Sequence, residues 1–249
     1  MIDGSGRELE RRESGEDPYV LGVNSCPSGW LICCYEEPAR RLSFCVMPKF
    51  ADILQYYDRA ERIAVGVPIG LPEGSRERCC DVEARRRLGF PLAAAVFRVP
   101  VRPAAYAESY AAALALSRER CGKEIFKATW AFCPKIVEVD RIMRPEMQER
   151  VFEAHREVCF WGIKRSPMRH KKKTPDGYEE RRGLLSDALC CELAKRDRCH
   201  CQELGVEPSK LLDTAAAVLT AHRAFLGESE RFPHESEIDA HGLRMEMVY

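Results

Sequence analysis

Ile-Ala-Val-Gly-Val-Pro-Ile-Gly-Leu-Pro, residues 63–72, is the stretch of sequence that most strongly indicates the fold. Its apolar first half is typical of a buried strand, and its glycines and prolines then break that strand into a turn. Residues 20–30, Val-Leu-Gly-Val-Asn-Ser-Cys-Pro-Ser-Gly-Trp, form an earlier strand and turn of the same kind. The pair suggests a catalytic scaffold, in which Asn24 and Gly66 stand at the two strand ends.

The length and composition of the chain predict one full-sized domain. The chain has 249 residues, of which 45% are hydrophobic, enough for a single large core. Lys and Arg together number 39, as do Asp and Glu, so any nucleic-acid binding must rest on a local basic patch. Residues 1–17 are polar and charged, and we expect a disordered tail there followed by a single domain at 18–249.

The cysteines and the apolar segments indicate where the protein works. Most of the thirteen cysteines occur as adjacent pairs or inside apolar runs, a pattern typical of small apolar side chains in a reducing compartment. No apolar stretch is long enough to span a bilayer, and the N-terminal run has no apolar segment of the signal-peptide type. We therefore expect a soluble, cytoplasmic protein with no membrane partner.

The order of apolar patterns and turn residues predicts an α/β fold with a mixed central sheet flanked by helices. Strands at 19–23, 29–35 and 41–47, joined by tight turns, predict an antiparallel three-strand meander. A helix at 50–59 and a strand at 62–67 then predict a parallel crossover. The later elements expected are helices at 80–89 and 104–118, a helical turn after 134–140, a strand at 151–161, helices at 178–195 and 209–226, and an edge strand at 242–249.

This order of meander, crossover and C-terminal helices is that of ribonuclease H-like domains, and short motifs narrow the resemblance. They are residues 22–30; Val67-Pro68-Ile69-Gly70-Leu71-Pro72; Arg76 with Asp81 and Ala84-Arg85; Val96-Phe97 with Pro100 and Arg102; Pro134-Lys135-Ile136 with Glu138-Val139-Asp140; Glu153 with His155 and Glu157; Lys172-Lys173-Thr174 with Gly177 and Arg181; and Asp213 with Ala215. Together they resemble domain-of-unknown-function family 429, whose members are described as predicted nucleases. The resemblance runs from about residue 21 to residue 249 and implies a ribonuclease H-like fold.

The resemblance implies a hydrolase that cuts nucleic-acid phosphodiesters, DNA or RNA, with the help of Mg²⁺ or Mn²⁺. In such enzymes carboxylates hold the ions, because hard divalent cations bind oxygen ligands. Two positions depart from the family pattern. Asn24 stands where the first aspartate is expected and offers only a neutral oxygen, whereas Gly66 stands where relatives have a second aspartate and offers no side chain. The implied metal site is therefore weakened.

The remaining acids supply the other candidate catalytic residues. The candidate set is Asn24, Glu157, Asp213 and Glu153, of which the first three are also the candidate metal ligands. Glu157 matches the family's His-Pro-Glu element, with Arg156 in place of the proline. Asp213 heads an alanine-rich helix and either points to the sheet or complements the helix dipole. Glu153 is also consistent with a solvent-facing strand residue.

Basic residues form a second kind of candidate site. The candidate phosphate-binding residues are Arg76, Arg85, Arg102, Lys135 and Lys172. Guanidinium groups bind phosphate oxygens through paired hydrogen bonds, which suits a nucleic-acid groove. Each residue taken singly is equally consistent with a solvated surface side chain.

Cys199, His200 and Cys201 lack the spacing of structural zinc ligands, so no zinc is expected there. Three functional hypotheses stay open. The first is a metal-dependent nuclease, and the second is a catalytically inactive relative that binds nucleic acid or regulates. The third, a nucleotide or small-molecule binder, is less favoured because the chain has no Gly-rich phosphate loop of the Walker type.

Overall fold

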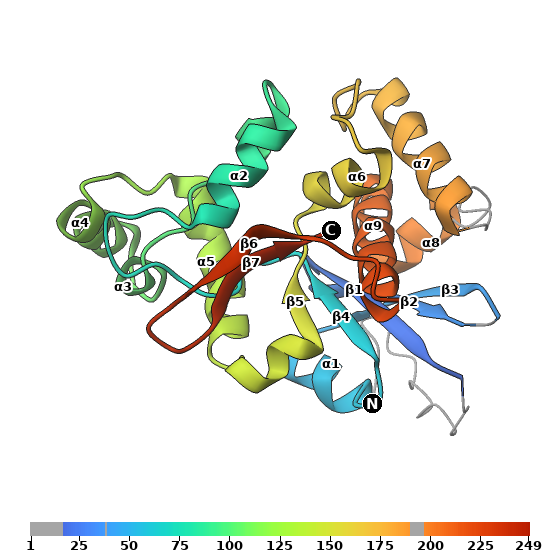
Figure 1. The fold of residues 1–249 in the computed structure, drawn as a ribbon, viewed down its shortest axis with the longest axis horizontal. Helices are drawn as coiled ribbons and strands as arrows, with labels where there is room; N and C mark the ends of the chain where they lie inside the picture. The colour runs from blue at the N-terminus through green and yellow to red at the C-terminus, as the bar shows by residue number, and fades with distance from the viewer. Residues whose placement is uncertain (1–16, 38, 190–196) are drawn as a thin grey trace. The chain divides into compact units, whose positions relative to one another are not determined.

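The computed structural model describes residues 17–37, 39–189 and 197–249, and Figure 1 shows its ribbon. The chain divides into two compact units. Unit 1 comprises Met1–Gly66, Ala154–Glu230 and Tyr249, and unit 2 comprises Val67–Glu153 and Arg231–Val248. Apart from Asp17, the expected tail at residues 1–17 lies outside the described residues. That residues 18–249 form a single domain stays a prediction.

Unit 1 is built on the predicted meander and crossover. Strands β1 (Tyr19–Cys26), β2 (Gly29–Glu36) and β3 (Arg41–Met47) pair antiparallel in succession. Helix α1 (Phe50–Tyr56) then leads to β4 (Arg62–Val65), which pairs parallel with β1. Within unit 1 the strand order is therefore β3-β2-β1-β4, and the α/β class with a mixed sheet is confirmed.

Helices cover both faces of this sheet. Helix α9 (Pro208–Phe225) packs against β1, β2 and β4, as Figure 1 shows. The close approach requires glycine at position 22, because a Cβ there would lie 2.3 Å from a backbone oxygen of α9. Ser25 points to the opposite face of β1, and its partner Trp30 packs against Phe50 of α1 with ring centroids 5.2 Å apart.

Three further helices surround α9 in unit 1. They are α6 (Arg156–Lys164), α7 (Pro175–Leu189) and α8 (Asp197–Leu204), and each packs against it. A buried cluster joins side chains of the sheet to side chains of α8, α9 and the segment between these two helices: Cys26, Leu31, Val46, Cys201, Val206 and Leu211. The cysteines in this cluster fill the core as small apolar groups, as expected.

Unit 2 contains a hairpin that the sequence only half predicts. Strands β6 (Arg231–Ile238) and β7 (Arg244–Val248) pair antiparallel, and α2 (Cys79–Leu88) packs against both. The expected strand at 242–249 is confirmed as β7. Strand β6 was not predicted, because its charged side chains and internal proline are unfavourable signals for a strand.

Other elements of unit 2 depart from the expected bounds. They are η1 (Leu92–Ala95), α3 (Arg102–Ala105), α4 (Tyr110–Cys121), α5 (Lys127–Asp140), η2 (Pro145–Glu149) and β5 (Val151–Glu153). The expected helix at 104–118 is divided because Ser109 caps α4, accepting a hydrogen bond from the Ala112 amide at 3.2 Å.

The expected strand at 151–161 is wrong beyond its third residue. Only β5 is extended, and α6 starts at Arg156, within the charged run His155-Arg156-Glu157. Val158, Cys159 and Phe160 are buried in succession, as in a central strand, because α6 packs against both α7 and α9. A helix covered on two sides has no polar stripe in its middle, and its periodicity is lost.

Candidate functional site

Asn24 and Gly66 lie at the ends of β1 and β4, the two parallel strands of unit 1. Asn24 is buried, and its Nδ2 donates to Thr214 Oγ1 at 3.3 Å. Thr214 in turn donates to the carbonyl of Lys210 at 2.8 Å. A Cβ at Gly66 would lie 1.8 Å from Asn24 Oδ1. The amide oxygen of Asn24 therefore occupies the space that a side chain at position 66 would need.

Asp213 lies in the second turn of α9, so it is not the first-turn acid that the sequence suggested. Its carboxylate is buried and forms an ion pair with the ammonium of Lys172. Burial raises the pKa of Asp213, and the Lys172 charge opposes that rise. Asp213 Oδ1 has no hydrogen-bond partner among the described residues. The candidate ligand is thus already held by a cation.

Glu157 lies in the first turn of α6 and is also ion-paired. Arg181 of α7 donates through Nη2 to Glu157 Oε2 at 2.8 Å, and both side chains are buried. Arg181 also donates through Nη1 to the carbonyls of Gly177 and His170, at 3.1 and 3.2 Å. This buried pair ties α6 to α7, which gives Glu157 a structural role.

Further cations surround these acids. Arg156 and Lys172 both act electrostatically on Asp213 and on Lys210. The pKa of Lys210 is lowered, chiefly by burial, and its ammonium donates to the Ser25 carbonyl at 3.2 Å. We call this group the Asp213 cluster: Glu157, Asp213, Arg156, Lys172, Arg181 and Lys210. Its four cations outnumber its two carboxylates, so it carries an excess of positive charge.

The Asp213 cluster does not fit a two-metal site. A pair of divalent ions needs several carboxylate charges, yet both acids here are paired with cations and Asn24 is neutral. In the part of the chain that the structure describes, no group of three or more His, Cys, Asp or Glu side chains is arranged to hold a metal ion. Both carboxylates are held by cations in this arrangement, and a metal-binding role for Asn24, Glu157 and Asp213 stays a prediction.

Glu153 lies in unit 2, where it forms part of a fully buried ionic group. It accepts hydrogen bonds from Arg78 Nη1 at 2.8 Å, Arg78 Nη2 at 2.9 Å and the Ile69 amide at 2.8 Å. Arg78 also pairs with Asp81 at 2.6 Å and donates to the carbonyls of Ile69 and Gly70. Glu153 is therefore neither a solvent-facing residue nor free to bind a metal.

Arg102 of α3 is likewise anchored by acids within unit 2. It forms ion pairs with Asp140 and Asp239, and its Nε donates to Glu73 at 2.8 Å. The Tyr106 hydroxyl donates to Asp140 at 2.7 Å. Burial and this hydrogen bond raise the pKa of Tyr106 to about 12. Arg102 thus holds α3, α5 and the end of β6 together.

Most of the chain matches one known protein family. The model of a family described as "Protein of unknown function (DUF429)" matches residues 22–238. The chain belongs to the DUF429 family. Comparison with curated proteins and with solved structures finds no match. The matched range contains every residue of the Asp213 cluster, together with Asn24 and Gly66.

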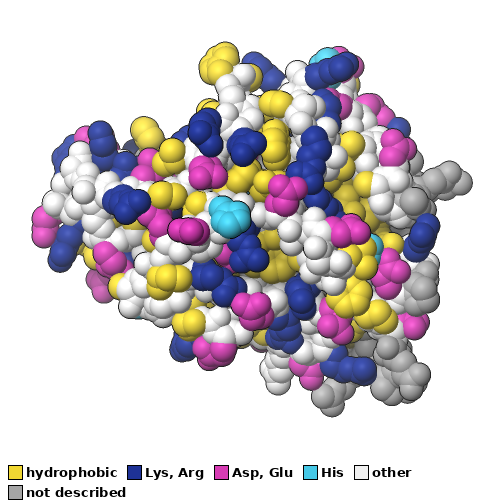
Figure 2. Space-filling model, viewed as in Figure 1, with side chains coloured by type: hydrophobic (Ala, Val, Ile, Leu, Met, Phe, Trp, Pro, Cys, Tyr) yellow, Lys and Arg dark blue, Asp and Glu magenta, His cyan; other side chains and the backbone are white. Residues whose placement is uncertain are grey.

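The other basic candidates of this DUF429 protein have carboxylate partners as well. Arg76 pairs with Glu237 at 3.0 Å, Arg85 with Glu77 at 2.5 Å, and Lys135 with Glu138 at 3.2 Å. Of these three, Arg76 alone is largely exposed, at 81% of its side chain. On the face shown in Figure 2, Lys and Arg side chains are interspersed with Asp and Glu. No single-sign surface is visible there, so a phosphate-binding role for these three residues stays a prediction.

Sequence reasoning missed Arg78 and Lys210, and it quoted Arg156 and Arg181 only as parts of motifs. The buried pairs join residues far apart in the chain: Arg78 and Glu153 are separated by 75 positions, and Arg181 and Glu157 by 24. The available signal was chemical. A buried carboxylate on an apolar element requires a cation, and Arg is the residue that most often provides it.

Two remaining expectations concern zinc and membranes. The side chains of Cys199 and His200 lie outside the described residues, so the expectation of no zinc there stays a prediction. The cysteines that the structure describes are free thiols. Within residues 17–37, 39–189 and 197–249, no helix is both long enough and apolar enough to cross a membrane.

Proposed function

We propose that this DUF429 protein is a ribonuclease H-like domain that binds nucleic acid through phosphate groups at the Asp213 cluster, without metal-dependent cleavage. The strand order β3-β2-β1-β4, with α9 on the sheet, supports the fold assignment. The observation that carries the functional proposal is the ion pair between Lys172 and Asp213. The ammonium group lies on the carboxylate that a nuclease would use to hold a metal ion.

The charge balance of the cluster favours an anionic ligand. Unlike charges attract and like charges repel most strongly where water is scarce, and Lys210 is already partly desolvated. A divalent cation entering this cluster would meet Arg156, Lys172 and Lys210, whereas a phosphate oxygen would be attracted by all three. Phosphate contacts of this kind supply most of the affinity in non-specific nucleic-acid binding.

A metal-dependent nuclease is the second candidate function. One observation favours it: Asp213 Oδ1 is buried and makes no hydrogen bond among the described residues, which leaves one oxygen able to accept a ligand. In that case Lys172 must move away from Asp213 before an ion binds. The two candidates therefore differ in what happens when Mg²⁺ or Mn²⁺ is added.

The decisive experiment measures binding and cleavage on the same substrates: single strands, duplex, RNA/DNA hybrid and four-way junction. We expect fluorescence anisotropy to show binding that weakens as salt rises, with no cleavage in Mg²⁺ or Mn²⁺. Lys172→Gln should lower the magnitude of the salt-dependence slope by about 0.9 on duplex DNA and about 0.7 on single strands, the values for one lost phosphate contact. The neighbouring, exposed Lys173 provides the matched control, and Lys173→Gln should leave the slope nearly unchanged.

Two results would overturn the proposal. Cleavage that requires Mn²⁺ or Mg²⁺ and disappears in Asp213→Ala would establish the nuclease instead. Absence of salt-sensitive binding to every substrate would reject both candidates. Because the Lys172 substitution also leaves a buried carboxylate without its cation, circular dichroism must first show that Lys172→Gln is folded at the assay temperature.

A further inference from the structure

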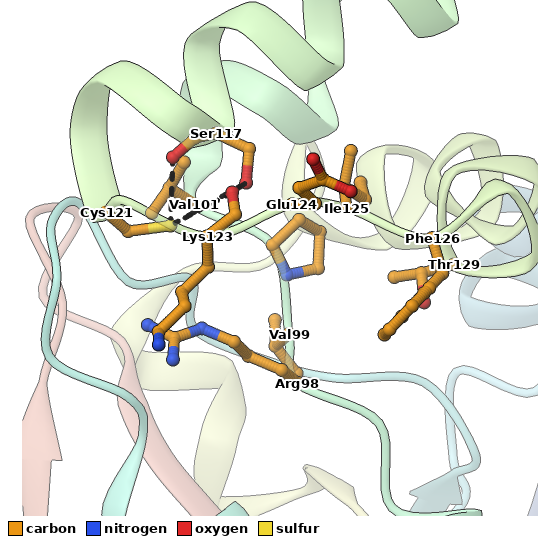
Figure 3. Close-up of a pocket in the computed structure, with 11 residues that line it drawn as sticks. Arg98, Val99, Val101, Ser117, Cys121, Lys123, Glu124, Ile125, Phe126 and Thr129 are labelled. Atoms are coloured by element: carbon orange, nitrogen blue, oxygen red, sulfur yellow. Dashed lines mark hydrogen bonds between the residues drawn. The ribbon is translucent and has the colours of Figure 1, made fainter.

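A cavity of about 260 Å³ lies within unit 2, between residues 98–101, the end of α4 and the first turn of α5 (Figure 3). Its walls are mainly apolar and include Val99, Val101 and Ile125. Phe126 borders the cavity and is 75% exposed. Small-molecule sites usually measure about 300 to 1,000 Å³, so this cavity, slightly below that range, suits only a small ligand.

One side of the cavity is cationic. Figure 3 shows the head groups of Lys123 and Arg98 on the same side of it. The Lys123 ammonium has no hydrogen bond or ion pair with any described residue. Arg98 forms an ion pair with Glu77 at 3.8 Å, and its Nη2 donates to the Ser75 carbonyl at 2.9 Å. The one acid that lines the cavity, Glu124, is already paired with Arg118. The Lys123 ammonium therefore offers an unneutralised positive charge to a ligand, with the Arg98 guanidinium beside it.

The opposite side offers hydrogen-bond donors. Helix α5 begins after Phe126 without a side-chain cap, and its first intrahelical bond runs from the Trp130 amide to the Phe126 carbonyl at 2.9 Å. The amides before Trp130 thus belong to an uncapped helix N-terminus. Thr129 lines the cavity and is only 7% exposed, yet its hydroxyl has no hydrogen-bond partner in the described ranges. An unpartnered hydroxyl that lines a cavity can donate a hydrogen bond to a ligand atom.

We propose that this cavity binds a small organic anion. A carboxylate or phosphate group is held by Lys123 and Arg98, a flat apolar body lies along Val99 and Val101, and a hydrogen-bond acceptor at the far end accepts from the Thr129 hydroxyl. No residue of the Asp213 cluster lines the cavity, so this site is additional to the nucleic-acid site proposed above. Each proposal can fail without the other.

The first test uses the full chain and 4-acetylbenzoate, which carries a carboxylate, a flat ring and a carbonyl acceptor. The phosphate arm uses 4-acetylphenyl phosphate, and the neutral control is 4-acetylbenzamide. Calorimetry should detect both charged probes and not the neutral one, and the tighter of the two identifies the head group. Site-resolved alkylation then locates the probe, because the Cys121 thiol borders the cavity. At ten times the dissociation constant, labelling of Cys121 should slow roughly tenfold while Cys79 is unaffected.

Substitutions make the test specific. Lys123→Gln should weaken binding of the charged probes about tenfold, the usual effect of losing one charge-assisted hydrogen bond. Thr129→Val keeps the side-chain shape and should weaken binding about threefold. Lys127→Gln is the matched control, because Lys127 lies over the Tyr110 ring and does not line the cavity. Equal binding of the neutral probe, no binding of any probe, or full affinity in Lys123→Gln would each overturn the proposal.

Discussion

Replacing Arg78 by methionine should be among the most destabilising single changes in unit 2. The Arg78 side chain is fully buried and pairs with both Asp81 and Glu153. Methionine fills similar space without charge, so two buried carboxylates lose their only described cation partner. Breaking a buried pair in this way costs about 3–5 kcal/mol of unfolding free energy. Arg76→Met removes an exposed pair instead and should cost less than about 1 kcal/mol.

The pH dependence of this variant gives an independent check. Burial raises the pKa of Glu153, and Arg78 opposes that rise. In Arg78→Met the opposing charge is gone, so the pKa of Glu153 in the folded state lies further above its value in the unfolded chain. A folded state that binds a proton more tightly than the unfolded state gains stability as pH falls. The stability deficit of the variant should therefore shrink as pH falls toward 4.5, the ordinary pKa of glutamate.

Urea unfolding followed by circular dichroism, at about pH 7 and about pH 5, measures both effects on the same samples. Arg78→Lys serves as a second control, because it keeps the charge and loses the fork of paired hydrogen bonds. It should fall between the wild-type chain and Arg78→Met. If Arg78→Met and Arg76→Met differ by less than about 1 kcal/mol at neutral pH, Arg78 does not hold the buried acids as described.

Three further predictions concern steric contacts and thiols. Gly22→Ala places a methyl group 2.3 Å from a backbone oxygen of α9 and should cost about 1–3 kcal/mol; an unchanged urea midpoint would show that the helix lies farther from β1. Gly66→Ala should cost a similar amount, and adding Asn24→Ala should recover most of it, whereas additive losses would contradict the contact between the two residues. Burial raises the pKa of Cys133 to about 11, so iodoacetamide should label this thiol at about pH 8 only after denaturation; rapid labelling of the native chain would show that it is accessible.

The parts of the fold that were predicted correctly depend on local signals. The meander β1–β3 has tight turns between short apolar runs, and each strand pairs with its neighbour in sequence. The elements that were missed depend on distant partners. Strand β6 has an unfavourable strand sequence and is stabilised by pairing with β7 and packing on α2. Helix α5 continues through Pro134 because its buried side chains on either side hold it in place.

The sequence analysis selected candidate site residues by their chemical type, but it did not predict which residues they pair with. Asp213 and Glu157 are buried acids in unit 1, and each is paired with a cation from a different element. The residue type determines the charge of a side chain, whereas the tertiary fold decides whether that charge is available to a ligand. Lys172 was expected to contact phosphate directly. Its partner Asp213 lies 41 positions away in the sequence, so local spacing does not predict this pair.

In the sequence, Asn24 and Gly66 look like two separate losses of an expected aspartate. In the structure the two positions are in contact, so the residue at one restricts the residue at the other. The amide oxygen of Asn24 fills the volume that any side chain at position 66 would occupy, and its Nδ2 binds Thr214. An aspartate restored at position 66 alone would therefore displace Asn24 rather than complete a metal site. Lys172 would still neutralise Asp213. The contact of Asn24 with the space at position 66 and the pairing of Lys172 with Asp213 therefore support the proposed anion site over a metal site that has lost single ligands.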